Sequence, residues 1–154
     1  MSLEFLVWLE GSALGLWVRE SLWGYPIVLS SHAVGMAIVV GMVSMIDIRV
    51  LGFARKIPIS SFNSLFNLTW AGFAVNFTSG CMLFSGDAIK FFNSTPFRIK
   101  IILIILCMIS VWMLLREVKG MDTGVSSARA RFIAAVSLLC WFGAITAGRL
   151  TAYL

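Results

Sequence analysis

The stretch that decides the fold is residues 26–46, which read PIVLSSHAVGMAIVVGMVSMI. A helix needs about 20 mostly apolar residues to cross the ~30 Å hydrocarbon core of a bilayer. This stretch is that long and carries His32 as its one ionisable side chain. Pro26 suits the first turn of a helix, where its missing N–H costs nothing. We therefore predict a transmembrane helix over 26–46, with Asp47 and Arg49 marking its far end.

The composition of the whole chain agrees with a lipid environment. Of its 154 residues, 60% are hydrophobic and 12% are charged, whereas soluble domains are about half apolar and about a quarter charged. The net charge is +5, but the basic residues flank apolar runs in short segments. This pattern indicates contact with the lipid bilayer and its anionic headgroups, and it gives no support to nucleic-acid binding. The three cysteines form no CxxC or CxxCH motif, so neither covalent haem nor a thiolate zinc site is indicated.

Three further spans are predicted, at about 65–85, 97–115 and 132–153. The span at 97–115 is almost purely aliphatic after its first residues, which favours extensive lipid contact. The span at 65–85 is the most polar, and its polar groups need partners because lipid offers none, so this helix should face its neighbours. These polar residues are Asn67, Thr69, Asn76, Thr78 and Ser79.

The N-terminal segment, residues 3–23, has no uninterrupted apolar run long enough to span a bilayer. We predict one or two short helices lying at the membrane interface, with Trp8, Trp17 and Trp23 at headgroup depth. The predicted fold is thus all-α: a single domain, 1–154, forming an integral membrane four-helix up-down bundle with a short interfacial N-terminal segment. Short loops make antiparallel neighbours the default arrangement.

Lysine and arginine counts predict the orientation. Seven basic residues follow the first and third spans, and five lie on the other side. The excess favours a multi-pass protein of the bacterial inner membrane with both termini in the periplasm. Glycines in the first, second and fourth spans permit close helix approach, and we expect a homo-oligomer or a partner in a larger membrane complex.

His32, the only histidine, is the first candidate for chemistry. It lies about seven residues into its span, ~10 Å below the outer surface at 1.5 Å per residue. An ionisable group at that depth is costly and calls for a reason. His32 could ligate haem iron or copper, carry a proton, or hydrogen-bond a neighbouring helix as a neutral packing residue. No relay of ionisable groups joins Asp47 to His32, so a proton pump is not indicated.

Basic residues predicted at similar depth suggest a cofactor with anionic groups. Haem b would place its iron on His32 and its propionates on Arg98, Lys100 or Arg149. One histidine cannot give bis-histidine ligation within one chain, so the second axial ligand would come from another chain or from methionine, or the site would be five-coordinate. Arg149 could equally pair with Asp87, with a span-two hydroxyl or with lipid phosphate, or snorkel to the surface.

Copper and quinone are the weaker alternatives. His32, Met36 and Met82 would form a soft Cu(I) site, although methionine also commonly fills gaps in apolar cores.

A set of short motifs in order along the chain carries a family resemblance. They are ESL (20–22), YP (25–26), His32, DIRVLG (47–52), WAGF (70–73), SG (79–80), LF (83–84), FRIK (97–100) and AGRLTAY (147–153). With these the chain resembles an uncharacterised proteobacterial family of four-helix inner-membrane proteins, a domain of unknown function. The resemblance implies the fold and names no activity. A looser, fold-level similarity is to four-helix b-type cytochromes and copper-resistance membrane proteins.

Two functions are therefore predicted. The first is a haem b-binding electron-transfer subunit with its cofactor near the periplasmic face, exchanging electrons with a quinone or a periplasmic partner. The alternative is a non-catalytic, self-associating or scaffold subunit of a larger membrane complex. A solute or metal carrier ranks last, because the sequence shows no pair of broken helices.

Overall fold

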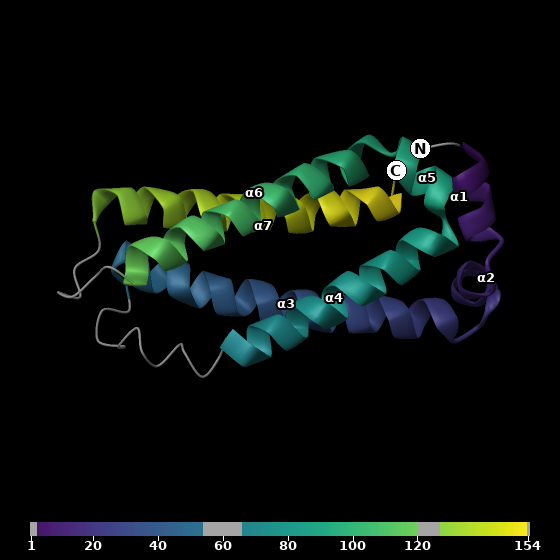
Figure 1. Ribbon diagram of the computed structural model, residues 1–154, viewed down its shortest axis with the longest axis horizontal. Coiled ribbons are helices and arrows are strands. Elements are labelled where there is room, and N and C mark those ends of the chain that lie inside the picture. Colours follow the sequence, from purple (N-terminus) through teal and green to yellow (C-terminus); the bar gives the residue numbers. More distant parts are fainter. Residues whose placement is uncertain (1–2, 54–65, 120–126, 154) are drawn as a thin grey trace. The chain divides into compact units, whose positions relative to one another are not determined.

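The computed structural model describes residues 3–53, 66–119 and 127–153, and all regular structure in these ranges is helical. The prediction of an all-α chain is confirmed. The helices are α1 (Leu3–Glu10), α2 (Ala13–Glu20), α3 (Gly24–Leu51), α4 (Phe66–Gly86), α5 (Ala88–Asn93), α6 (Thr95–Lys119) and α7 (Ala128–Tyr153) (Figure 1). The basic loop predicted after the first span, with Arg55, Lys56 and Pro58, lies outside the described residues, and so does Leu65.

Within the described residues, three helices are long and apolar enough to cross a membrane: Gly24–Leu51, Thr95–Leu114 and Ala128–Thr151. They contain most of the first, third and fourth predicted spans. The helix α4, which matches the second predicted span, is 21 residues long but is not one of these three. Its two asparagines, two threonines and two serines lower its hydropathy.

The helix α3 continues past the predicted end of its span. Asp47 and Arg49 do not end it, since both are buried within its last turns. Its last residue is Leu51, because the next residue, Gly52, has a φ of 106°. This is the left-handed conformation, which glycine adopts without steric cost. There the Gly52 N–H donates to Arg49 O and the Phe53 N–H donates to Ile48 O, each at 3.2 Å. This pair of bonds is a Schellman C-cap, which satisfies carbonyls that the end of the helix would leave open.

The described residues form two compact units. The first contains residues up to Val39 together with 68–95, and the second contains residues 40–67 and 96–154. The helix α3 contributes its first part to the first unit and its remainder to the second.

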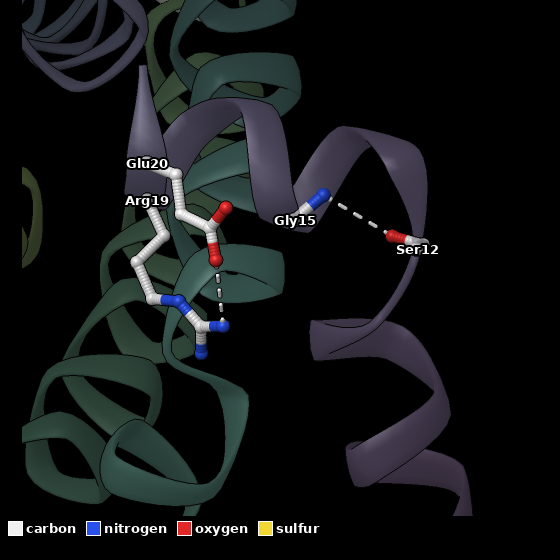
Figure 2. A network of polar contacts seen from close by, with 4 residues as sticks. All are labelled: Ser12, Gly15, Arg19 and Glu20. Carbon is white, nitrogen blue, oxygen red and sulfur yellow. Dashed lines mark hydrogen bonds and ion pairs between the residues drawn. The ribbon is translucent and has the colours of Figure 1, made fainter. Parts of the chain in front are cut away.

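Two short helices, α1 and α2, form the N-terminal segment and lie with α5 beside the ends of α3 and α4 (Figure 1). The side chain of Ser12 caps α2 by accepting the Gly15 N–H at 3.1 Å (Figure 2). Gly15 allows α2 to pack against the end of α4, because a Cβ there would lie 2.7 Å from Ser85 O. Arg19 and Glu20 form an exposed ion pair at 3.5 Å (Figure 2).

The helix α5 was not predicted, and a distant residue caps it. The Glu10 carboxylate accepts the Ile89 N–H at 2.8 Å, whereas Asp87 at the N-cap position makes no side-chain capping bond. An acidic side chain near a helix N-terminus satisfies an orphan N–H and complements the helix dipole. Glu10 is 79 positions away in sequence, so no local pattern could identify this cap.

In the second unit, α6 and α7 run side by side (Figure 1). Two glycines of α7 lie against side chains of α6: a Cβ at Gly143 would lie 3.3 Å from Leu103, and one at Gly148 would lie 3.4 Å from the end of the Lys100 side chain. A buried apolar cluster joins this pair to the end of α3. It comprises Val50, Leu114, Ala130, Ile133 and Ala134.

Candidate functional site

The candidate site is the crossing of α3 and α4 in the first unit, where His32 and Asn76 are linked to each other's backbones. The Asn76 side-chain N–H donates to the His32 carbonyl at 2.9 Å. In return, His32 Nδ1 lies 3.0 Å from the Asn76 carbonyl. We call these two bonds the His32–Asn76 clamp. Asn76 and Ser79 of α4 thus turn toward a neighbouring helix as predicted, whereas Asn67 and Thr78 of the same helix are exposed.

The clamp fixes which ring nitrogen of His32 carries the proton. The Asn76 carbonyl only accepts, so Nδ1 must be the donor. The Ser79 hydroxyl lies 3.1 Å from Nδ1 and donates its own hydrogen to Val75 O at 2.6 Å. Its oxygen can therefore also accept from Nδ1. In the neutral imidazole, the lone pair then resides on Nε2.

Glycines bring the two helices together at this crossing. A Cβ on Gly35 would lie 2.7 Å from the Asn76 backbone nitrogen and 2.8 Å from Gly72 O. A Cβ on Gly72 would lie 2.6 Å from the Ile38 side chain. Both distances are far below van der Waals contact, so these positions require glycine. Small residues of this kind allow membrane helices to approach closely and exchange hydrogen bonds.

The imidazole of His32 also packs directly against α4. A Cβ on Gly80 would lie 3.2 Å from Cε1 of the ring. One edge of His32 thus faces Gly80, while Nδ1 faces Asn76 and Ser79. The ring serves helix pairing through both its shape and its hydrogen bonding.

The other residues of the predicted copper site, Met36 and Met82, belong to the same unit. Both are half-buried, and Cys81 beside Met82 is exposed. Within residues 3–53, 66–119 and 127–153, no three His, Cys, Asp or Glu side chains are grouped as a metal site would need.

The three basic residues predicted to hold haem propionates all lie in the second unit, and His32 lies in the first. Arg98 and Arg149 are exposed, on α6 and α7. Lys100 is half-buried with its side chain along Gly148. Neither unit contains all four residues, so the shared site of His32 with Arg98, Lys100 and Arg149 stays a prediction.

Sequence reasoning missed a second buried polar group. Asp47 was expected to mark a helix end, yet it is 0% exposed and lies beside Ser137 of α7. A signal was available, because Asp47 lies four residues after Val43 and three before Val50, on one face of α3. Both valines are buried, so this face is part of the core of the second unit.

Among known proteins, no family model, no curated protein and no solved structure matches this chain. The resemblance to an uncharacterised four-helix family stays a prediction.

Proposed function

We propose that the chain is a multi-pass protein of the bacterial inner membrane in which α4 is a fourth span. At 1.5 Å per residue, its 21 residues reach about 30 Å, the thickness of the hydrocarbon core. Polar groups that lower its hydropathy, Asn76 and Ser79, have partners inside the first unit. Burial of this kind is how polar residues are accommodated in a membrane helix.

The opposite side of α4 supports the same proposal. Trp70 meets Phe73 edge to face and Phe73 stacks on Phe77 along the helix, with ring centroids 6.0 and 6.1 Å apart. Trp70 is 64% exposed and Phe77 is 63% exposed. In water such a face would be unfavourable, whereas lipid tails solvate it at no cost.

Reporter fusions test the topology. A phosphatase that is active only in the periplasm would be fused after residue 60, after Asn93, after residue 122 and at the C-terminus. With four spans and periplasmic termini, the fusions after Asn93 and at the C-terminus are active and the other two are inactive. Equal activity after residue 60 and after Asn93 would refute α4 as a span.

For the biochemical role, we propose a non-catalytic subunit that associates with itself or with a larger membrane complex. The observation that carries this proposal is the His32–Asn76 clamp, because the chain's only histidine is engaged in pairing two helices. Gly41 supports the association, since a Cβ there would meet nothing within 4 Å. That open small residue leaves room for another helix to approach α3 closely.

A second candidate is haem b binding at His32, favoured by one observation. Histidines that ligate metals commonly donate the other ring N–H to a carbonyl, which fixes the tautomer, and Nδ1 of His32 does so toward Asn76. Nε2 would be the axial ligand, with Met36 or Met82 as the other candidate ligand. Bound haem would supply one-electron chemistry, and a Cu(I) ion on the same three residues is the weaker form of this hypothesis.

Two variants at one position separate these roles. In His32→Asn, the amide N–H stands in for Nδ1–H and can still donate to the Asn76 carbonyl, but it cannot replace Nε2 as an iron ligand. His32→Ala removes both functions. Optical spectra, oxidised and reduced, would be recorded for the wild type and both variants in mild detergent, with the mass of each complex measured in parallel.

The subunit proposal predicts no haem absorption bands, a wild-type mass above that of one chain, and complexes kept by His32→Asn but weakened by His32→Ala. Haem b binding predicts a Soret band in the wild type that both variants lose. A monomeric wild-type protein with no co-purifying partner would refute the subunit proposal.

A further inference from the structure

The second unit contains a carboxyl group in an unusual position. Asp47 of α3 is 0% exposed, and both of its carboxylate oxygens are buried without a hydrogen bond of ordinary geometry in the described part of the chain. On α7, Ser137 Oγ and Trp141 Nε1 are likewise buried without a hydrogen-bond partner among the described residues. Ser137 and Trp141 are four residues apart and therefore share one face of their helix. Ser137 Oγ is the hydroxyl beside the Asp47 carboxyl.

In the part of the chain that the structure describes, the one charged or polar side chain that acts on the Asp47 carboxyl is the Ser137 hydroxyl. The helix α6 contributes the Cys107 thiol, and α7 contributes Cys140, whose thiol lies beside that of Cys107. On α3 itself, Arg49 is two residues further along, about 200° around the helix at 3.6 residues per turn. The polar groups placed beside Asp47 are thus the Ser137 hydroxyl and the Cys107 thiol.

The remaining surroundings are apolar. Val50, three residues after Asp47 on the same face of α3, belongs to the buried apolar cluster with Leu114 and Ile133. An isolated carboxylate in such an environment has a large desolvation cost, which a buried group avoids by pairing or by becoming neutral. With no cation acting on it in the described part of the chain, neutralisation by a proton is the remaining route.

We propose that Asp47 and Ser137 form a proton-binding site inside the bundle. The carboxyl carries the proton as COOH and donates it in a hydrogen bond to the adjacent Ser137 hydroxyl. A proton needs no cavity and no further ligands, which fits a site closed by packed side chains. Because α3 ends four residues later, at Leu51, about 6 Å of helix separates the carboxyl from the end of α3. The proton exchanges with water on that side only, so the site binds a proton locally and conducts none across the membrane.

Loss of the proton leaves a charge between α3 and α7, so proton binding is coupled to the packing of these helices. Intramembrane carboxyls that gain and lose protons are a common means of linking pH to helix movement. This inference is independent of the subunit and haem proposals, because it involves only the second unit.

Infrared spectra of the full-length protein in lipid, compared between the wild type and single variants, test the proposal directly. We expect the carbonyl stretch of a protonated carboxylic acid at neutral pH, sensitive to deuterium exchange. The band should be absent in Asp47→Asn and shifted in frequency in Ser137→Ala. Glu20→Gln is the control, because this carboxyl is exposed and its loss should leave the band unchanged. A spectrum with no protonated-acid band at neutral pH would overturn the proposal, and so would a band that Ser137→Ala leaves in place.

A stability measurement covers the case in which a variant folds poorly. The amide of Asp47→Asn resembles the protonated acid in size and charge, so this variant should unfold no faster than the wild type at neutral pH. At alkaline pH it should unfold more slowly, since only the wild type can ionise there. Faster unfolding of Asp47→Asn at every pH would indicate a carboxylate with a counter-ion and overturn the proton site. Suppression of the infrared band by added Na⁺ or K⁺ would also overturn it, in favour of a cation site.

Discussion

Gly35→Ala tests whether the crossing of α3 and α4 is set by backbone contact. The added Cβ would lie 2.7 Å from Asn76 N and 2.8 Å from Gly72 O. Both neighbours are backbone atoms, which cannot rotate away as a side chain can. Ordinary contact begins near 3.4 Å, so the helices must separate by about 0.7 Å.

Three terms set the magnitude of the effect. Overpacking of this kind destabilises a protein by about 1–3 kcal/mol. A separation of that size also stretches both bonds of the His32–Asn76 clamp, now 3.0 and 2.9 Å, beyond the usual range. Bonds between membrane helices are worth about 0.6 kcal/mol each. Alanine recovers about 1 kcal/mol through its higher helix propensity. We therefore expect a net loss of about 1–3 kcal/mol in the free energy of unfolding.

Reversible unfolding in mixed micelles, followed by circular dichroism, measures this loss. Gly41→Ala is the matched control, because it makes the same change on the same helix with no atom within 4 Å of the new Cβ. At a dilution where the chain is monomeric and no second helix can cover Gly41, the control should be neutral or stabilising by up to about 1 kcal/mol. Equal unfolding free energies for Gly35→Ala and Gly41→Ala would refute the close approach at Gly35.

Three smaller changes have expected outcomes that the same unfolding assay checks. Asn76→Ala removes the donor to the His32 carbonyl and should cost about 0.5–2 kcal/mol, the range for hydrogen bonds between membrane helices; no loss would remove the clamp as a source of stability. Glu10→Ala uncaps α5 and should cost about 1 kcal/mol, with faster amide exchange confined to that helix and its neighbours; exchange unchanged in α5 would contradict the cap. Arg129→Ala breaks an ion pair with Glu117 at 3.4 Å on a largely exposed arginine, so it should change stability by less than about 1 kcal/mol; a larger loss would indicate another role for Arg129.

Helix ends show where local sequence patterns stop being informative. The charges of Asp47 and Arg49 suggested an end to the first span, because charged side chains are costly in lipid. Protein surrounds both of them in the structure, so that cost does not end the helix there. The end of α3 depends instead on the positive φ of Gly52. Because Gly52 sets the end, α3 extends to Leu51, five residues beyond the predicted end of its span.

By itself, the sequence determined that the chain is helical, and three of the four spans it predicted, at 26–46, 97–115 and 132–153, correspond to helices apolar enough for a membrane, since length and apolar content are local properties. It also determined that the polar span must face other helices, because buried polar groups need partners. Tertiary structure alone decided which partners those are: Asn76 for His32, Glu10 for α5 and Ser137 for Asp47. Each of these pairs joins residues far apart in sequence, and their meeting depends on how closely the helices approach and on which faces they turn toward each other.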